Sequence, residues 1–133
     1  MVSILLLSHG PLAPALAESA ALVAGRRRGV AALELSPGDS PGAFRARVEA
    51  ALKAALEEGE AVVLTDMVLG TPFNTAISLM GDYPFRHLSG MSLPLLLALL
   101  NARERGGSAE EVCAAALEDH AAQPVDVDGL VRG

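Results

Sequence analysis

Four short apolar runs alternate with longer helical segments along this chain, and this alternation restricts the possible folds more than any other feature. The runs are Val2–Leu7, Val30–Leu35, Ala61–Thr65 and the less apolar Arg86–Gly90. The first and third runs are continuously apolar, which is typical of strands covered on both faces. Repeated strand–helix units predict an α/β fold: a doubly wound, mainly parallel sheet of four or five strands with helices on both faces.

The segments between these runs predict helices. Apolar residues recur at helical spacing, and a proline stands in the first turn of most segments. The expected helices are Pro11–Arg27, Pro41–Glu58, Pro72–Met80, Leu93–Arg105 and one from Ser108 to about Gln123. Residues 124–133 alternate valine with aspartate and predict a short strand or an ordered tail. The whole chain, 1–133, has the length of a single domain.

Composition limits the partners. The net charge of −6 and the pI near 4.9 argue against binding a nucleic-acid backbone or an anionic membrane surface. A single cysteine, Cys113, excludes an internal disulfide and a cysteine-rich zinc site, and we interpret it as a small core residue. The apolar runs are too short to span a membrane and no signal peptide is recognised, so a cytoplasmic location is expected.

The first run ends at Ser8-His9-Gly10, and Pro11 follows at once. In an open parallel sheet, ligands bind beyond the carboxyl ends of the strands, so His9 is the first candidate for chemistry. The helix start beside it carries N–H groups that can bind an anion. A lone histidine is more often structural, and His87 and His120 are interpreted as structural or exposed.

Asp66 follows the third run and should lie at the same edge as His9. A carboxylate that accepts a hydrogen bond from Nδ1–H fixes the tautomer and leaves a lone pair on Nε2. Nε2 is then a nucleophile toward a phosphoryl group. We expect Nδ1 of His9 to lie about 2.7–3.2 Å from an Asp66 oxygen, with Nε2 facing solvent. The alternative is that Asp66 merely caps the next element.

The loop from Met67 to Asn74 is the third candidate. Gly70 supplies flexibility, Thr71 supplies a hydroxyl, and a proline leads the next helix. The Thr71 hydroxyl and the neighbouring amides could bind phosphoryl oxygens. Thr71 could equally be an ordinary N-cap, and the two roles are compatible.

Together these motifs resemble the enzyme IIA component of the mannose class of the bacterial phosphoenolpyruvate-dependent sugar phosphotransferase system. The resemblance runs from Val2 to about Ala122, and its most specific part is Asp-x-x-x-Gly-Ser/Thr-Pro-Phe-Asn at Asp66–Asn74. The stretches HGPLAPALAESAALVAG, SPGDSP and SGMSLPLLLALLNAR extend it.

The resemblance implies a phosphoryl carrier without metal or cofactor. His9 would accept a phosphoryl group from the phosphocarrier protein HPr and pass it to a histidine of a IIB component on a separate chain, with Asp66 orienting the ring. The substrate-binding residues would be Gly10, Gly70, Thr71 and Ser92. The resemblance also implies a homodimer, in which residues 124–133 could be an edge strand or a strand exchanged between subunits.

Three departures from the family pattern stand out. Leu69 replaces a frequent glycine, which predicts a different backbone or docking surface for this loop. Ser92 replaces a common asparagine. The tail after Gln123 is short, which argues against strand exchange.

Three alternative functions have to be compared with this one. One is a regulatory module that binds a protein in one phosphorylation state, and another is the phosphoryl-donor subunit of dihydroxyacetone kinase. The third, a receiver domain phosphorylated on Asp66, is disfavoured because Ser8-His9-Gly10 stands where a receiver needs acidic metal ligands.

Overall fold

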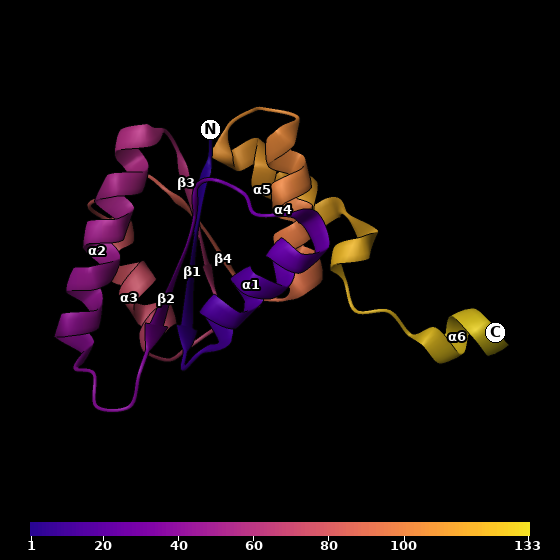
Figure 1. The fold of residues 1–133 in the computed structure, drawn as a ribbon, viewed down its shortest axis with the longest axis horizontal. Helices are drawn as coiled ribbons and strands as arrows, with labels where there is room; N and C mark the ends of the chain where they lie inside the picture. The colour runs from indigo at the N-terminus through magenta and orange to yellow at the C-terminus, as the bar shows by residue number, and fades with distance from the viewer.

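The computed structural model describes all 133 residues and has three layers, with a sheet between two layers of helices (Figure 1). The sheet contains four parallel strands in the order β2-β1-β3-β4. The strands are β1 (Ser3–His9), β2 (Val30–Leu35), β3 (Ala61–Thr65) and β4 (Arg86–Ser89). This is the predicted fold class, with four strands rather than five.

The helices divide between the two faces of the sheet. Helices α2 (Pro41–Glu58) and α3 (Thr71–Met80) cover one face. The other face is covered by α1 (Leu12–Ala24), α4 (Leu93–Glu104) and α5 (Ala109–Glu118), as Figure 1 shows. The short 3-10 helix η1 (His120–Ala122) follows α5.

Strand β1 lies at the centre of the sheet and supplies both hydrophobic cores. Ile4 and Leu6 belong to the core shared with α1, α4 and α5, whereas Leu5 and Leu7 belong to the core shared with α2. Successive side chains of a strand point to opposite faces, which explains this division and why the whole run is apolar. Cys113 is buried in the first core, as predicted, and burial raises the pKa of its thiol to about 11.

The tail differs from the predicted strand. Residues Val127–Arg132 form helix α6, whose first turn is capped by Asp126 through the N–H of Gly129. Figure 1 shows this helix extending away from the rest of the chain, and its residues are exposed. The tail is therefore not an edge strand of this sheet, and exchange with a second copy remains a prediction. No helix combines the length and the apolar character needed to cross a membrane.

Candidate active site

His9 and Asp66 come together because β1 and β3 are neighbours that run in the same direction. Leu7 is paired with Thr65, so both polar residues follow at the carboxyl edge of the sheet. The chain passes from β1 outward to β2 and then returns to β3 on the other side of β1. This reversal creates the switch point at which open α/β sheets bind ligands.

The Asp66 carboxylate is held by three hydrogen bonds. Its Oδ2 lies 2.8 Å from Nδ1 of His9 and also accepts the backbone N–H of His9 at 2.8 Å. Its Oδ1 accepts the backbone N–H of Met67 at 2.9 Å. The side chain is only 8% exposed, so its orientation is set by β1 on one side and by its own loop on the other. The predicted distance between His9 and Asp66 is confirmed.

This arrangement determines which ring nitrogen of His9 can react. An ionised carboxylate only accepts hydrogen bonds, so Nδ1 carries a proton and Nε2 of the neutral ring keeps its lone pair. Nε2 has no hydrogen-bond partner in the chain, and the His9 side chain is 46% exposed. The ring is therefore oriented as a nucleophile that an external electrophile can reach.

Gly70 packs directly against the reactive edge of the ring. A Cβ atom added to Gly70 would lie 2.8 Å from Cε1 and 2.9 Å from Nε2 of His9, and its φ of +92° also favours glycine. Gly70 is the N-cap residue of α3 and Thr71 is its first residue, so the alternative that Thr71 is an ordinary N-cap is wrong.

The first turn of α3 leaves donors available beside this ring. The first N–H with an intrahelical partner is that of Asn74, which donates to the Gly70 carbonyl at 2.9 Å. The N–H groups of Thr71 and Phe73 and the Thr71 hydroxyl have no partner in the chain. Donors of this kind at a helix start can bind phosphoryl oxygens.

Gly10 shapes the turn after His9 but has no free donor. Its N–H donates to the Leu35 carbonyl at 2.8 Å, and its φ is +56°. Ser8, which is fully buried, donates from Oγ to the Gly10 carbonyl and accepts the N–H of Ala13, both at 2.8 Å. Sequence reasoning missed Ser8, although a polar residue at the last buried position of a strand signals such a turn.

Ser92 lies in a neighbouring loop. Its hydroxyl accepts the N–H of Leu95 at 3.2 Å and caps α4. The adjoining Met91 donates its N–H to the backbone carbonyl of Asp66 at 3.2 Å. A backbone hydrogen bond therefore connects the loop of Ser92 with the loop of Asp66. The structure gives no contact between Ser92 and His9.

Sequence reasoning also missed a part-buried polar network between the ends of β3 and β4. Thr65 Oγ1 donates to Ser89 Oγ and lies 2.9 Å from Nε2 of His87, and the His87 ring packs on Phe73 with ring centroids 5.3 Å apart. Burial lowers the pKa of His87. The network connects the end of β3 with β4 and α3. His87 is therefore structural, as predicted, and His120 is exposed.

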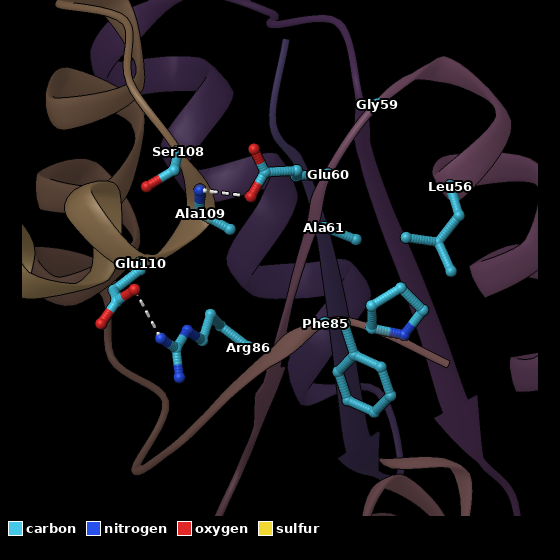
Figure 2. A pocket seen from close by; sticks show the side chains of 10 residues that line it. Leu56, Gly59, Glu60, Ala61, Phe85, Arg86, Ser108, Ala109 and Glu110 are labelled. Atoms are coloured by element: carbon cyan, nitrogen blue, oxygen red, sulfur yellow. Dashed lines mark hydrogen bonds and ion pairs between the residues drawn. The ribbon is translucent and has the colours of Figure 1, made fainter. Parts of the chain in front are cut away.

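A separate hollow of about 510 Å³ lies at the opposite, amino edge of the sheet (Figure 2). Glu60 accepts the N–H of Ala109 at 3.0 Å there, and Arg86 pairs with Glu110 at 2.9 Å. The hollow is lined by neither histidine nor cysteine. No group of three histidine, cysteine or acidic side chains in the chain could hold a metal ion.

The fold and the pair of side chains define an α/β domain that presents a carboxylate-oriented histidine at its switch point. Residues 3–117 match the family model EIIA-man, described as the PTS system fructose IIA component. The chain belongs to this family of IIA components of the sugar phosphotransferase system, as the sequence motifs indicated.

Individual relatives agree with this assignment. The chain is 32% identical over 105 residues to the fructose-specific EIIA component of Bacillus subtilis, covering 78% of this chain and 72% of the relative. It is 33% identical over 114 residues to the sorbose-specific EIIA component of Klebsiella pneumoniae, covering 85% and 82%. The solved mannose/sorbose-specific IIA subunit of Enterococcus faecalis superposes with a TM-score of 0.78 at 26% identity, covering 93% of this chain and 94% of that chain.

Proposed function

We propose that this chain is a phosphoryl carrier: His9 accepts a phosphoryl group from HPr and passes it to a IIB component during sugar uptake. The observation that supports this proposal most directly is the 2.8 Å contact between Nδ1 of His9 and Oδ2 of Asp66. It leaves Nε2 as the reactive nitrogen of the ring. Membership of the IIA family supports this direction of transfer.

The transfer forms one bond and breaks one bond. The lone pair of Nε2 attacks phosphorus, and the bond between phosphorus and the leaving atom of the donor breaks, with its electron pair staying on the donor. The proton on Nδ1 remains in place, so the ring becomes positively charged as it is substituted. The carboxylate of Asp66 lies against Nδ1 and stabilises that charge. Transfer to the acceptor runs through the same steps in reverse.

The incoming phosphoryl oxygens would be bound by the start of α3. The N–H groups of Thr71 and Phe73 are free of partners in the chain, as is the Thr71 hydroxyl. Preorganised donors stabilise charge that develops on transferring oxygens, because no reorganisation is needed during the reaction. Gly70 keeps this helix start against the ring, since any side chain there would meet Nε2.

We further propose that the carrier acts in the cytoplasm as a homodimer. Helix α6 has only six residues, and a helix that short is not stable in water without packing. Its apolar residues Val127, Leu130 and Val131 are all exposed in the single chain, and a second copy would cover them. Light scattering should give a dimer mass for the full chain and a lower mass after residues 124–133 are removed.

Phosphorylation by HPr tests the main proposal. Intact-mass analysis after incubation with HPr, enzyme I and phosphoenolpyruvate should show one added phosphoryl group on the wild-type chain. The His9→Ala variant should remain unlabelled, whereas His120→Ala, which changes an exposed histidine in η1, should be labelled like the wild type. Labelling of His9→Ala, or no labelling of the wild type, overturns the proposal.

A further inference from the structure

A second hollow, of about 400 Å³, lies between α2 and α3, which pack side by side on one face of the sheet (Figure 1). Both helices begin at the carboxyl edge, because each follows the carboxyl end of a parallel strand. The volume of the hollow suits a small molecule, but most small-molecule sites are lined mainly by apolar side chains. This hollow is lined by no hydrophobic and no acidic side chain, so a ligand that fits it must be polar.

Arg45 of α2 is fixed in this hollow and keeps donors free. Its Nε donates to Oγ of Ser78 at 3.0 Å, and that Oγ donates to the Thr75 carbonyl at 2.7 Å. Its Nη groups form no hydrogen bond in the chain, since the carboxylate of Glu49 approaches Nη1 only to 3.8 Å and accepts the hydroxyl of Tyr83 instead. A guanidinium held in this way can bind an oxyanion through two N–H groups.

The first turn of α2 adds a donor beside Arg45. The N–H of Gly42 has no partner in the chain, because the side chain and the carbonyl of Ser40 accept the N–H groups of Ala43 and Phe44. Gly42 and Arg45 are three residues apart and are therefore neighbours on one face of the helix. Two Nη groups and this N–H outnumber the two oxygens of a carboxylate and match the three terminal oxygens of a phosphate monoester.

Thr75 is an independent sign of a ligand in the same hollow. The residue is only 6% exposed, and its hydroxyl has no hydrogen-bond partner in the chain. Every buried side-chain nitrogen and oxygen has a partner, so the small exposed part of Thr75 includes this hydroxyl, and Thr75 lines the hollow. A hydroxyl with little access to water and no partner is unfavourable. A hydroxyl group on a ligand would pair with it.

We propose that this hollow binds a phosphate monoester of a small polyhydroxylated molecule, the chemical class of sugar phosphates. The phosphate lies against the Nη groups of Arg45 and the N–H of Gly42. Hydroxyl groups of the ligand pair with Thr75 and with the exposed amide of Asn74. This site goes beyond the proposed carrier function and does not depend on it, because His9 does not line the hollow.

Titration of the isotope-labelled chain, followed by backbone amide shifts, tests the site. At least one of fructose-6-phosphate, mannose-6-phosphate and glycerol-3-phosphate should bind with a Kd of about 0.1–1 mM and shift the amides of Gly42 and Thr75. Fructose, mannose, glycerol and inorganic phosphate should each bind at least about tenfold more weakly, since each makes only part of the contacts.

Two variants assign the contacts. Arg45→Gln removes the charged donors and should raise the Kd about tenfold or more. Thr75→Val keeps the branched shape but removes the hydroxyl, and should raise the Kd about threefold to tenfold. Its Tm should not fall, because the hydroxyl has no hydrogen bond in the chain to lose. A merely structural role of Thr75 would change Tm and leave the Kd as it is.

Two further variants are controls. Arg47→Gln changes another arginine of α2, which pairs with Asp39 and does not line the hollow, so its Kd should stay within about twofold of wild type. His9→Ala removes the reactive ring and should also bind like the wild type. Loss of binding in His9→Ala would place the phosphate at the reactive histidine and overturn the inference.

The remaining outcomes also decide the matter. The inference is wrong if none of the three phosphate monoesters binds at about 10 mM. Equal affinity for inorganic phosphate, wild-type affinity in Arg45→Gln, or an equal loss of affinity in Arg47→Gln would each overturn it. If HPr does not label the wild type, the proposed carrier function fails, but the predicted binding in this hollow is unaffected.

Discussion

The charged groups at the amino and carboxyl edges of the sheet differ in how far they are buried and hydrogen-bonded. At the amino edge, Arg86 and Glu110 form an ion pair of 2.9 Å in which both side chains are about half or more exposed. At the carboxyl edge, the Asp66 carboxylate is nearly buried and accepts hydrogen bonds from two backbone N–H groups and from His9. Exposed pairs are screened by water, whereas a desolvated and fully bonded carboxylate interacts strongly.

This difference shows that the size of a hollow does not locate the reactive side chain in this molecule. The amino edge has the hollow of about 510 Å³, lined in part by Leu56 and Phe85 (Figure 2). His9 does not line that hollow: its imidazole is exposed at the carboxyl edge, where the second hollow of about 400 Å³ is lined by Thr71 and Asn74. The proposed exchange of a phosphoryl group with other proteins needs an accessible reactive atom, and an enclosing pocket would hinder the partner.

The largest effect is expected at Asp66. Asp66→Asn places an amide where Oδ2 now accepts two N–H groups. The carboxylate then no longer fixes the tautomer of His9, nor does it stabilise the positive charge of the substituted ring. Transfer from HPr should fall by about 10²–10⁴-fold. Single-turnover labelling with intact-mass detection measures this rate. A fall of less than threefold would show that the carboxylate does not orient the ring.

Gly70→Ala should have the next largest effect. The new Cβ would meet His9 Nε2 at 2.9 Å, at a φ of +92°, so the ring or the loop must move. The free energy of unfolding should fall by about 1–2 kcal/mol, and transfer by about tenfold. Urea unfolding and the labelling rate measure the two effects. Gly81→Ala is the matched control at the other end of α3, where a Cβ meets open space.

A smaller, pH-dependent effect on stability is expected at His87, which belongs to the network with Thr65 and Ser89. Burial lowers the pKa of His87 below 6.5, so the unfolded chain binds a proton more readily than the folded chain. The contribution of His87 to the free energy of unfolding is therefore fully present above pH 6.5. It is lost as the pH falls from there through the lower pKa of the folded chain.

His87→Gln should flatten this decrease. Thermal unfolding between pH 7.5 and 5, values spanning the histidine range, should show a shallower fall of Tm in the variant. His120→Gln removes an exposed histidine and should keep the wild-type profile. An equally steep fall in His87→Gln would assign the pH dependence to other groups.

The smallest effect is expected at the amino edge. Arg86→Gln breaks the exposed pair with Glu110, which should change the free energy of unfolding by less than about 0.5 kcal/mol. Transfer from HPr should be unchanged, although the substitution alters the lining of the hollow at the amino edge. A tenfold loss of transfer in this variant would contradict the contrast between the two edges.

Much of the fold and the central contact could be predicted because they follow from hydrophobic patterning and topology. Continuous apolar runs identified β2 and β3 with their observed bounds, and the capping signals identified α2. Once β1 and β3 are parallel neighbours, the residues after them must meet, so the contact between His9 and Asp66 followed without further information.

The missed features depend on contacts that a linear pattern does not contain. The network of Thr65, His87 and Ser89 requires the register between β3 and β4. The position of Gly70 as N-cap and the positive φ of Leu69 arise from the loop folding back onto His9. In the tail, alternating valines suggested a strand, but no neighbouring strand pairs with it, and local capping by Asp126 favoured a helix.

The central position of β1 has a consequence for how the molecule fluctuates. Every residue from Ser3 to Ser8 is buried, and the strand is paired on both sides. Backbone amides in such a strand exchange with solvent only in the rarest, most global openings, whereas loop amides exchange through small local ones. His9 is thus attached to the most persistent element of the molecule, whereas residues 67–69 beside it are exposed and belong to a loop.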